Sequence, residues 1–170
     1  MGNLFNLAAQ TLAKSLSASG NNKVITERVS SVNEFNQGLT RNGNVTGGVV
    51  FFGHGGLDSH SLSALFPGEL AGSNSYNITS LNVGQLSNKF LASGISITLN
   101  ACHAGLGGRT IAQIIANQLR RTVYAPPVDM FFSANPAPHY FNPKTDVAPG
   151  GIPAYMVPNS TAPLKAFTPQ

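Results

Sequence analysis

An apolar run ends at a histidine between glycines in the stretch Gly48-Val49-Val50-Phe51-Phe52-Gly53-His54-Gly55-Gly56. The same design recurs where Ile95-Ser96-Ile97-Thr98-Leu99 leads into Asn100-Ala101-Cys102-His103-Ala104-Gly105. Short runs rich in Val, Ile and Phe that end at such a turn are typical of buried strands in a parallel sheet. Functional sites in these sheets lie outside the carboxyl ends of the strands. We therefore expect His54 and Cys102 to lie at one edge of the sheet.

Around these two strands, the chain alternates between helical and extended patterns. Helices are predicted for residues 3–17, 31–39, 83–91 and 109–119, and further strands for residues 23–29 and 122–125. Ser31 and Glu34 form a capping-box pattern at the start of the second helix. Residues 59–66 alternate weakly and predict one arm of a hairpin. The pattern predicts an α/β fold, a sandwich with a mostly parallel central sheet flanked by helices.

The composition changes near residue 126 without indicating a second domain. Ten of the eleven prolines lie from Pro126 onward, where proline removes ladder donors and breaks helices. The same segment is rich in Phe and Tyr, so it is not expected to be simply disordered. We expect residues 1–125 to form the core, with the motifs in 47–125. Residues 126–170 are expected to pack on it as irregular coil, with one strand near 152–157.

Charge and cysteine content restrict the function. Only 9% of the 170 residues are charged, against about 25% in typical proteins. The net charge of +4 is spread along the chain, and Arg120-Arg121 is the only adjacent basic pair, so we expect no nucleic-acid partner. The single cysteine excludes an intrachain disulfide. No apolar run has the length of a membrane span, and no signal peptide is visible, which leaves the localisation open.

The two strand ends carry the side chains of a thiol nucleophile and its base. A thiol reacts as the thiolate, and a neighbouring imidazole is the usual means of forming it near neutral pH. Glycines follow each reactive residue, and we expect them to let backbone amides turn toward an oxyanion, with added positive potential from the helix that begins near residue 109. A lone cysteine after an apolar strand is also compatible with a buried structural residue.

A metal site is a further alternative. His54, Asp58, His60, Cys102 and His103 contain the donor atoms of a zinc set. None of them has a recognised ligand spacing such as His-Glu-x-x-His, so we expect no metal. Residues 105–110 lack the final glycine of a dinucleotide fingerprint, and no acidic residue follows at the ribose position. We therefore expect no cofactor.

Taken together, the two stretches resemble the motif blocks of the caspase-like (clan CD) cysteine peptidases. In that group an apolar strand ending in His-Gly precedes an apolar strand ending in Ala-Cys. The form Ala101-Cys102-His103-Ala104-Gly105 is most similar to CHAT domains. Residues 107–125 also resemble C-terminal domains of bacterial polymorphic toxins and secreted effectors. The resemblance covers residues 47–125.

The resemblance implies a cysteine endopeptidase with a His-Cys dyad. His54 would be the base or acid, Cys102 the nucleophile, and the backbone N–H groups of Gly55 and Cys102 the oxyanion hole. No carboxylate is required as a third member. Apart from the resemblance, Gly53, Asp58 and His103 are candidate supporting residues. Asp58 would either contact His54 or be an ordinary loop residue, and His103, which the family does not require, would either tune the thiol or simply lie in its loop.

Protein or peptide substrates follow from this resemblance. If the toxin resemblance holds, the domain would be secreted or delivered as an effector, or would process its own larger protein, and an immunity or inhibitor protein would bind its cleft. Two alternatives stay open. One is a catalytically inactive CHAT-like interaction module. The other is a Cys-His enzyme that performs another acyl transfer, such as deamidation or transglutamination.

Overall fold

The computed structural model describes residues 2–20, 23–29, 31–55, 61–63, 77–107, 110–127, 132–133, 139–140 and 164–170. The helical elements are α1 (Gly2–Ala18), α2 (Val32–Arg41), the short 3₁₀ helix η2 (Val83–Gln85) and α3 (Ile111–Leu119). The strands are β1 (Val49–Phe52), β2 (His54–Gly55), β3 (Ser61–Ser63), β4 (Asn77–Thr79), β5 (Ser96–Asn100), β6 (Thr122–Ala125), β7 (Phe132–Ser133), β8 (His139–Tyr140) and β9 (Lys165–Phe167).

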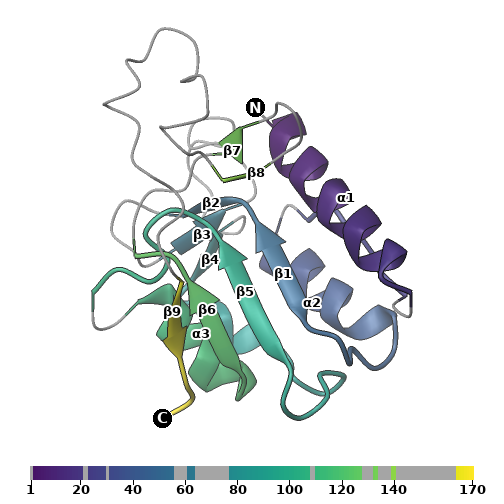
Figure 1. The fold of residues 1–170 in the computed structure, drawn as a ribbon. Coiled ribbons are helices and arrows are strands. Elements are labelled where there is room, and N and C mark those ends of the chain that lie inside the picture. Colours follow the sequence, from purple (N-terminus) through teal and green to yellow (C-terminus); the bar gives the residue numbers. More distant parts are fainter. Residues whose placement is uncertain are drawn as a thin grey trace, which may run out of the picture.

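A mostly parallel sheet of four strands forms the centre of the fold, in the order β1-β5-β6-β9 (Figure 1). β1, β5 and β6 are parallel to their neighbours, and β9 pairs with β6 in the antiparallel direction. The predicted α/β class and the three predicted strands that became β1, β5 and β6 are therefore confirmed. Two smaller antiparallel sheets, β2-β3-β4 and β7-β8, accompany the central one.

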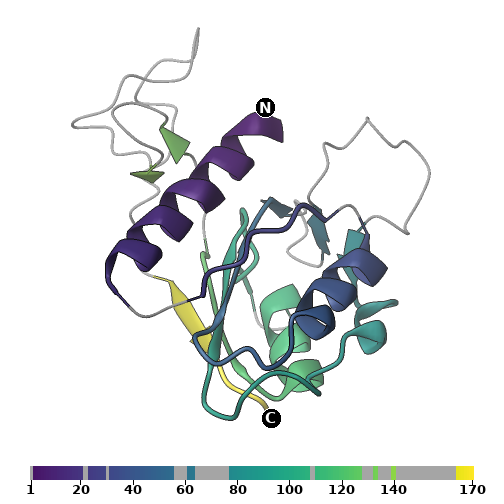
Figure 2. The ribbon, with the colours of Figure 1, turned by 90° about the vertical axis from the view of Figure 1, so that its right-hand side faces the viewer.

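The main core lies between the central sheet and helices α2 and α3. Inward residues alternate along the strands, as a pleated sheet with one fully covered face requires. Phe51, Ile97, Leu99 and Val123 point into this core, and Ile111, Ile115 and Leu119 of α3 meet them. The rings of Phe35 in α2 and Phe51 in β1 lie 5.8 Å apart at 81°. Figure 2 shows α1 on the side of the sheet opposite to α2 and α3.

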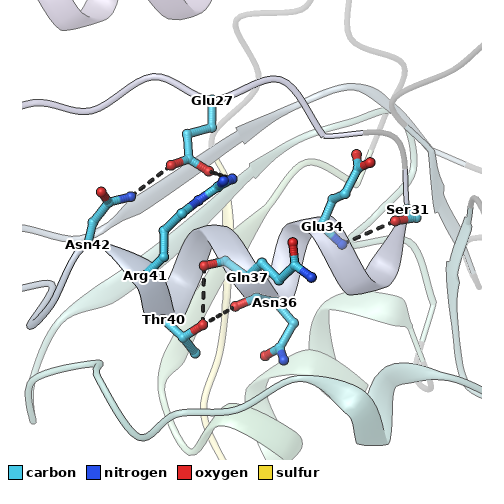
Figure 3. A network of polar contacts seen from close by, with 8 residues as sticks. All are labelled: Glu27, Ser31, Glu34, Asn36, Gln37, Thr40, Arg41 and Asn42. Atoms are coloured by element: carbon cyan, nitrogen blue, oxygen red, sulfur yellow. Dashed lines mark hydrogen bonds and ion pairs between the residues drawn. The ribbon is translucent and has the colours of Figure 1, made fainter.

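Helix α2 begins as its sequence predicts. The Ser31 hydroxyl accepts a hydrogen bond of 3.1 Å from the Glu34 amide, which is the backbone half of the capping box (Figure 3). The predicted strand at residues 23–29 is wrong, because this stretch has no strand ladder. Its Glu27 carboxylate instead accepts hydrogen bonds from Arg41 at 2.5 Å and Asn42 at 2.7 Å. Side-chain contacts to the end of α2 therefore hold residues 23–29 in place, although the β-branched residues of this segment predict a strand.

The predicted helix at residues 83–91 is also wrong. Only η2 is helical there, and the chain then runs irregularly to Leu91. Two backbone groups of this stretch pair with distant residues. The Ser87 amide donates to the Asn36 side chain at 2.8 Å. The Phe90 carbonyl accepts from Val45 at 2.7 Å, and Leu91 forms a parallel bridge with that residue. Leu86 and Leu91 are buried as predicted, but in a non-helical backbone.

Helix α1 is present as predicted, but few of its apolar side chains are buried. Ala8 is buried, whereas Leu7 and Leu16 are 40% and 37% exposed. At the other end of the chain, β9 extends the central sheet beyond β6, and β3 forms the hairpin arm expected within 59–66. The strand predicted near 152–157 lies outside the described residues.

Within the described part of the chain, no helix combines the length and apolar character needed to cross a membrane.

Candidate active site

His54 lies directly after the end of β1. Gly53 separates it from Phe52, and the Gly53 amide donates to the Asn100 carbonyl at 3.2 Å. His54 and Gly55 then form β2, in which His54 pairs with Ser63 and Gly55 with Leu62. The backbone at His54 is therefore extended and paired with β3. The sequence, in contrast, indicates a turn at this position.

The register of the central sheet aligns His54 with Cys102. Phe52 of β1 is the parallel partner of Asn100 of β5. His54 lies two residues after Phe52, and Cys102 lies two residues after Asn100. The Gly53–Asn100 hydrogen bond continues the pairing beyond the end of β1. Neighbouring strands lie about 4.8 Å apart. The two motifs thus leave adjacent strands at the same edge of the sheet, as expected from the sequence (Figure 1).

The backbones of the two motifs touch at Gly55. A Cβ atom built on Gly55 would lie 1.7 Å from the carbonyl oxygen of Cys102 and 3.0 Å from its nitrogen. No side chain fits in that space, so glycine is required here by close approach. Gly55 also has no positive φ angle. The peptide groups of the two positions that the resemblance assigns to the oxyanion hole are therefore direct neighbours.

The loop after Cys102 is compact and tied to the end of β6. The Ala104 amide donates to Ala101 at 3.3 Å, and the Leu106 amide donates to His103 at 2.9 Å, which gives two successive turns. The Gly105 amide donates to the Pro126 carbonyl at 2.8 Å. His103 has a φ of 54°, a left-handed conformation that costs energy for a residue with a side chain. Tertiary contacts thus hold Cys102 within a strained turn.

Two backbone amides at the N-terminus of α3 have hydrogen-bond partners within the loop and the cap. Thr110 is fully buried, and its hydroxyl accepts from the Gln113 amide at 3.1 Å. The Ala112 amide donates to the Ala104 carbonyl at 3.3 Å. These two amides are therefore occupied by the loop and the cap, and neither is available as an oxyanion donor.

Two residues that the sequence analysis did not single out lie beside the motifs. Asn100 is a polar residue that is only 3% exposed at the carboxyl end of β5. Phe5 of α1 contacts the imidazole of His54, with ring centroids 4.8 Å apart and planes at 85°. Asn100 could have been found from the sequence, because it is a polar residue at the end of an apolar strand. Phe5 has no such signal, because its contact depends on how α1 crosses the sheet.

The other predicted residues are placed only in part. Gly53 is buried between β1 and β2, and His103 follows Cys102 with its Nδ1 atom buried. Asp58, His60 and Gly56 lie outside the described residues. Among the residues that the structure describes, no three His, Cys, Asp or Glu side chains gather as a metal cluster.

At this edge of the sheet, a thiol and an imidazole lie on chain segments that follow paired positions of adjacent strands, and the backbone of Gly55 packs against the peptide of Cys102. Cys102 and His54 are both partly exposed. A thiol and an imidazole have the chemistry of a covalent nucleophile and its proton carrier. The arrangement is suited to acyl transfer.

Comparisons with known proteins add one partial match. Residues 67–142, less than half of the chain, are similar to a family described as Domain of unknown function (DUF8616). This region includes Cys102 and α3, and His54 precedes it. No curated protein and no solved structure matches the chain.

Proposed function

We propose that the protein is a cysteine endopeptidase in which Cys102 and His54 form the catalytic dyad. The observation that carries the proposal is that both residues follow the paired ends of adjacent parallel strands, with Gly55 packed against the peptide of Cys102. A dyad needs its two side chains at neighbouring positions, and continued β1–β5 register supplies that placement at backbone level.

The reaction would proceed in two steps. The Cys102 thiolate attacks the carbonyl carbon of a peptide bond and forms a carbon–sulfur bond, while the N–H groups of Gly55 and Cys102 stabilise the oxyanion. His54 donates its proton to the leaving amine as the carbon–nitrogen bond breaks. Water then attacks the thioester with His54 as base, which releases the carboxylic acid and regenerates the thiol.

The fold supports a caspase-like relationship in this proposal. A mostly parallel sheet carries the His-Gly and Ala-Cys ends on neighbouring strands, with helices on both sides. The substrate would be a protein or peptide. Delivery as a bacterial effector, or processing of a larger protein, follows from the toxin resemblance, as does an immunity or inhibitor protein that covers the cleft.

Substitution of Cys102 tests the proposal directly. The Cys102→Ala variant should keep the circular dichroism spectrum and unfolding midpoint close to wild type, since this side chain is partly exposed. It should lose all cleavage of an unfolded protein substrate, measured as new N-termini by mass spectrometry. Cleavage that persists in Cys102→Ala would refute the mechanism.

His54→Gln is the matched control for the imidazole. It should slow the stoichiometric alkylation of Cys102, which is the only cysteine and therefore the only thiol labelled. If the wild-type protein creates no new N-termini in the substrate but converts substrate glutamine to glutamate, the dyad catalyses deamidation. Wild-type alkylation no faster than that of His54→Gln would favour the inactive interaction module.

A further inference from the structure

The contact between Phe5 and His54 joins the first turns of α1 to the candidate active site. The two rings meet edge to face, with centroids 4.8 Å apart and planes at 85°. Residues 5 and 54 are far apart in sequence. Helix α1 lies on the face of the sheet opposite to α2 and α3 (Figure 2). The ring of Phe5 is itself partly buried.

The ring angle of His54 is one of the quantities on which the proposed dyad depends. The β2–β3 pairing fixes the backbone of His54. The terminal torsion of a histidine side chain is broad and does not select one ring orientation. An edge-to-face aromatic contact has a preferred geometry and therefore restricts that torsion. Proton transfer to or from Cys102 depends on which ring nitrogen faces the thiol.

We propose that Phe5 is a positioning residue for His54, so that helix α1 completes the active site. This inference rests on the proposed dyad and names a residue and an element that regulate it. Docked α1 holds the imidazole in the orientation that serves Cys102. When α1 lifts from the sheet, the imidazole loses the contact with Phe5 and the reactivity of the thiol falls.

Helix α1 is packed weakly enough for the contact between Phe5 and His54 to regulate the site. Among its described side chains, those of residues 5–18, only Ala8 is buried. Leu7 and Leu16 are large apolar side chains that stay substantially exposed. Elements with few buried apolar contacts open at low free-energy cost. A partner or an attached segment that displaces α1 would therefore change the activity without unfolding the central sheet.

Three variants of α1 test the inference in the full chain. Phe5→Leu removes the aromatic ring and keeps an apolar side chain, Phe5→Tyr restores a ring, and Leu7→Ala is a matched control on the same helix. The rate of Cys102 alkylation by iodoacetamide at neutral pH should fall about two- to tenfold in Phe5→Leu, the range that a typical aromatic pair supports. It should stay near wild type in Phe5→Tyr and Leu7→Ala.

The imidazole resonances of His54 in NMR spectra provide a second readout that does not depend on catalysis. Phe5→Leu should shift the His54 ring signals, because the neighbouring ring current is lost, and Leu7→Ala should not. Unchanged alkylation in Phe5→Leu, or an equal loss in Leu7→Ala, would overturn the positioning role even if the resonance shifts. Failure of the dyad would appear separately, as equal alkylation of wild type and His54→Gln.

Discussion

Replacement of Gly55 by alanine is the sharpest perturbation of the candidate site. The new Cβ atom would lie 1.7 Å from the Cys102 carbonyl oxygen and 2.7 Å from its carbonyl carbon. An ordinary carbon–oxygen contact is about 3.3 Å, so the overlap with the oxygen is about 1.6 Å. The backbone fixes the position of a Cβ atom, and the Cys102 atoms that it meets are main chain, so no change of rotamer relieves the clash. The strands carrying His54 and Cys102 must separate.

The expected cost follows from the size of this overlap. Overpacking in a core typically costs about 1–3 kcal/mol when side chains can adjust. Here the backbone must move, so we expect Gly55→Ala to lower the free energy of unfolding by at least about 3 kcal/mol. A domain of this kind has about 5–15 kcal/mol in total. The variant should therefore be markedly less stable, with a less reactive Cys102.

Urea unfolding followed by circular dichroism measures the stability, and iodoacetamide labelling measures the reactivity of Cys102. Gly47→Ala is the matched control, because a Cβ there meets nothing within 4 Å. It should stay within about 1 kcal/mol of wild type. A Gly55→Ala protein as stable as Gly47→Ala, with unchanged labelling, would refute the close contact between the two motifs and the placement of the dyad.

Two further predictions concern the loop between Cys102 and α3. His103→Gly should be about 1–2 kcal/mol more stable than His103→Ala in urea unfolding, because glycine adopts the φ of 54° without the penalty of a Cβ atom; equal stabilities would mean that the left-handed conformation is not retained. Thr110→Ala should cost about 1–2 kcal/mol through loss of the cap to Gln113, and Thr110→Ser should recover most of it; if both variants are equally destabilised, the buried methyl group matters and the cap does not.

The parallel core was predictable because its strands combine two signals. Residues 48–52, 95–99 and 122–125 are short and apolar, and each is bounded by glycine, proline or polar residues. Such segments have few alternatives to a buried strand. The rule that sites lie beyond the carboxyl ends of strands then places His54 and Cys102 at one edge. The pairing of Phe52 with Asn100, two residues before His54 and Cys102, is a further result that only the structure provides.

The two wrong predictions, a strand at 23–29 and a helix at 83–91, show where tertiary contacts override local sequence patterns. Residues 23–29 have the composition of a strand, but Glu27 is held by Arg41 and Asn42 at the end of α2. Residues 83–91 have helical spacing of buried apolar side chains, but the Ser87 amide donates to Asn36 and the Phe90 carbonyl accepts from the Val45 amide. In both cases the partners lie outside the local window, so periodicity alone does not reveal them.

Gly55 illustrates how one residue type carries different physical meanings. From sequence, a glycine after a histidine indicates a turn or an exposed amide, both of which use its conformational freedom. In the structure, its φ is not positive, and the space where a side chain would begin is filled by the Cys102 carbonyl. A turn glycine tolerates substitution at the cost of strain, whereas this one sets the distance between two strand ends. Because that distance decides whether His54 can reach Cys102, the missing side chain of Gly55 is as important to the proposed chemistry as the reactive groups themselves.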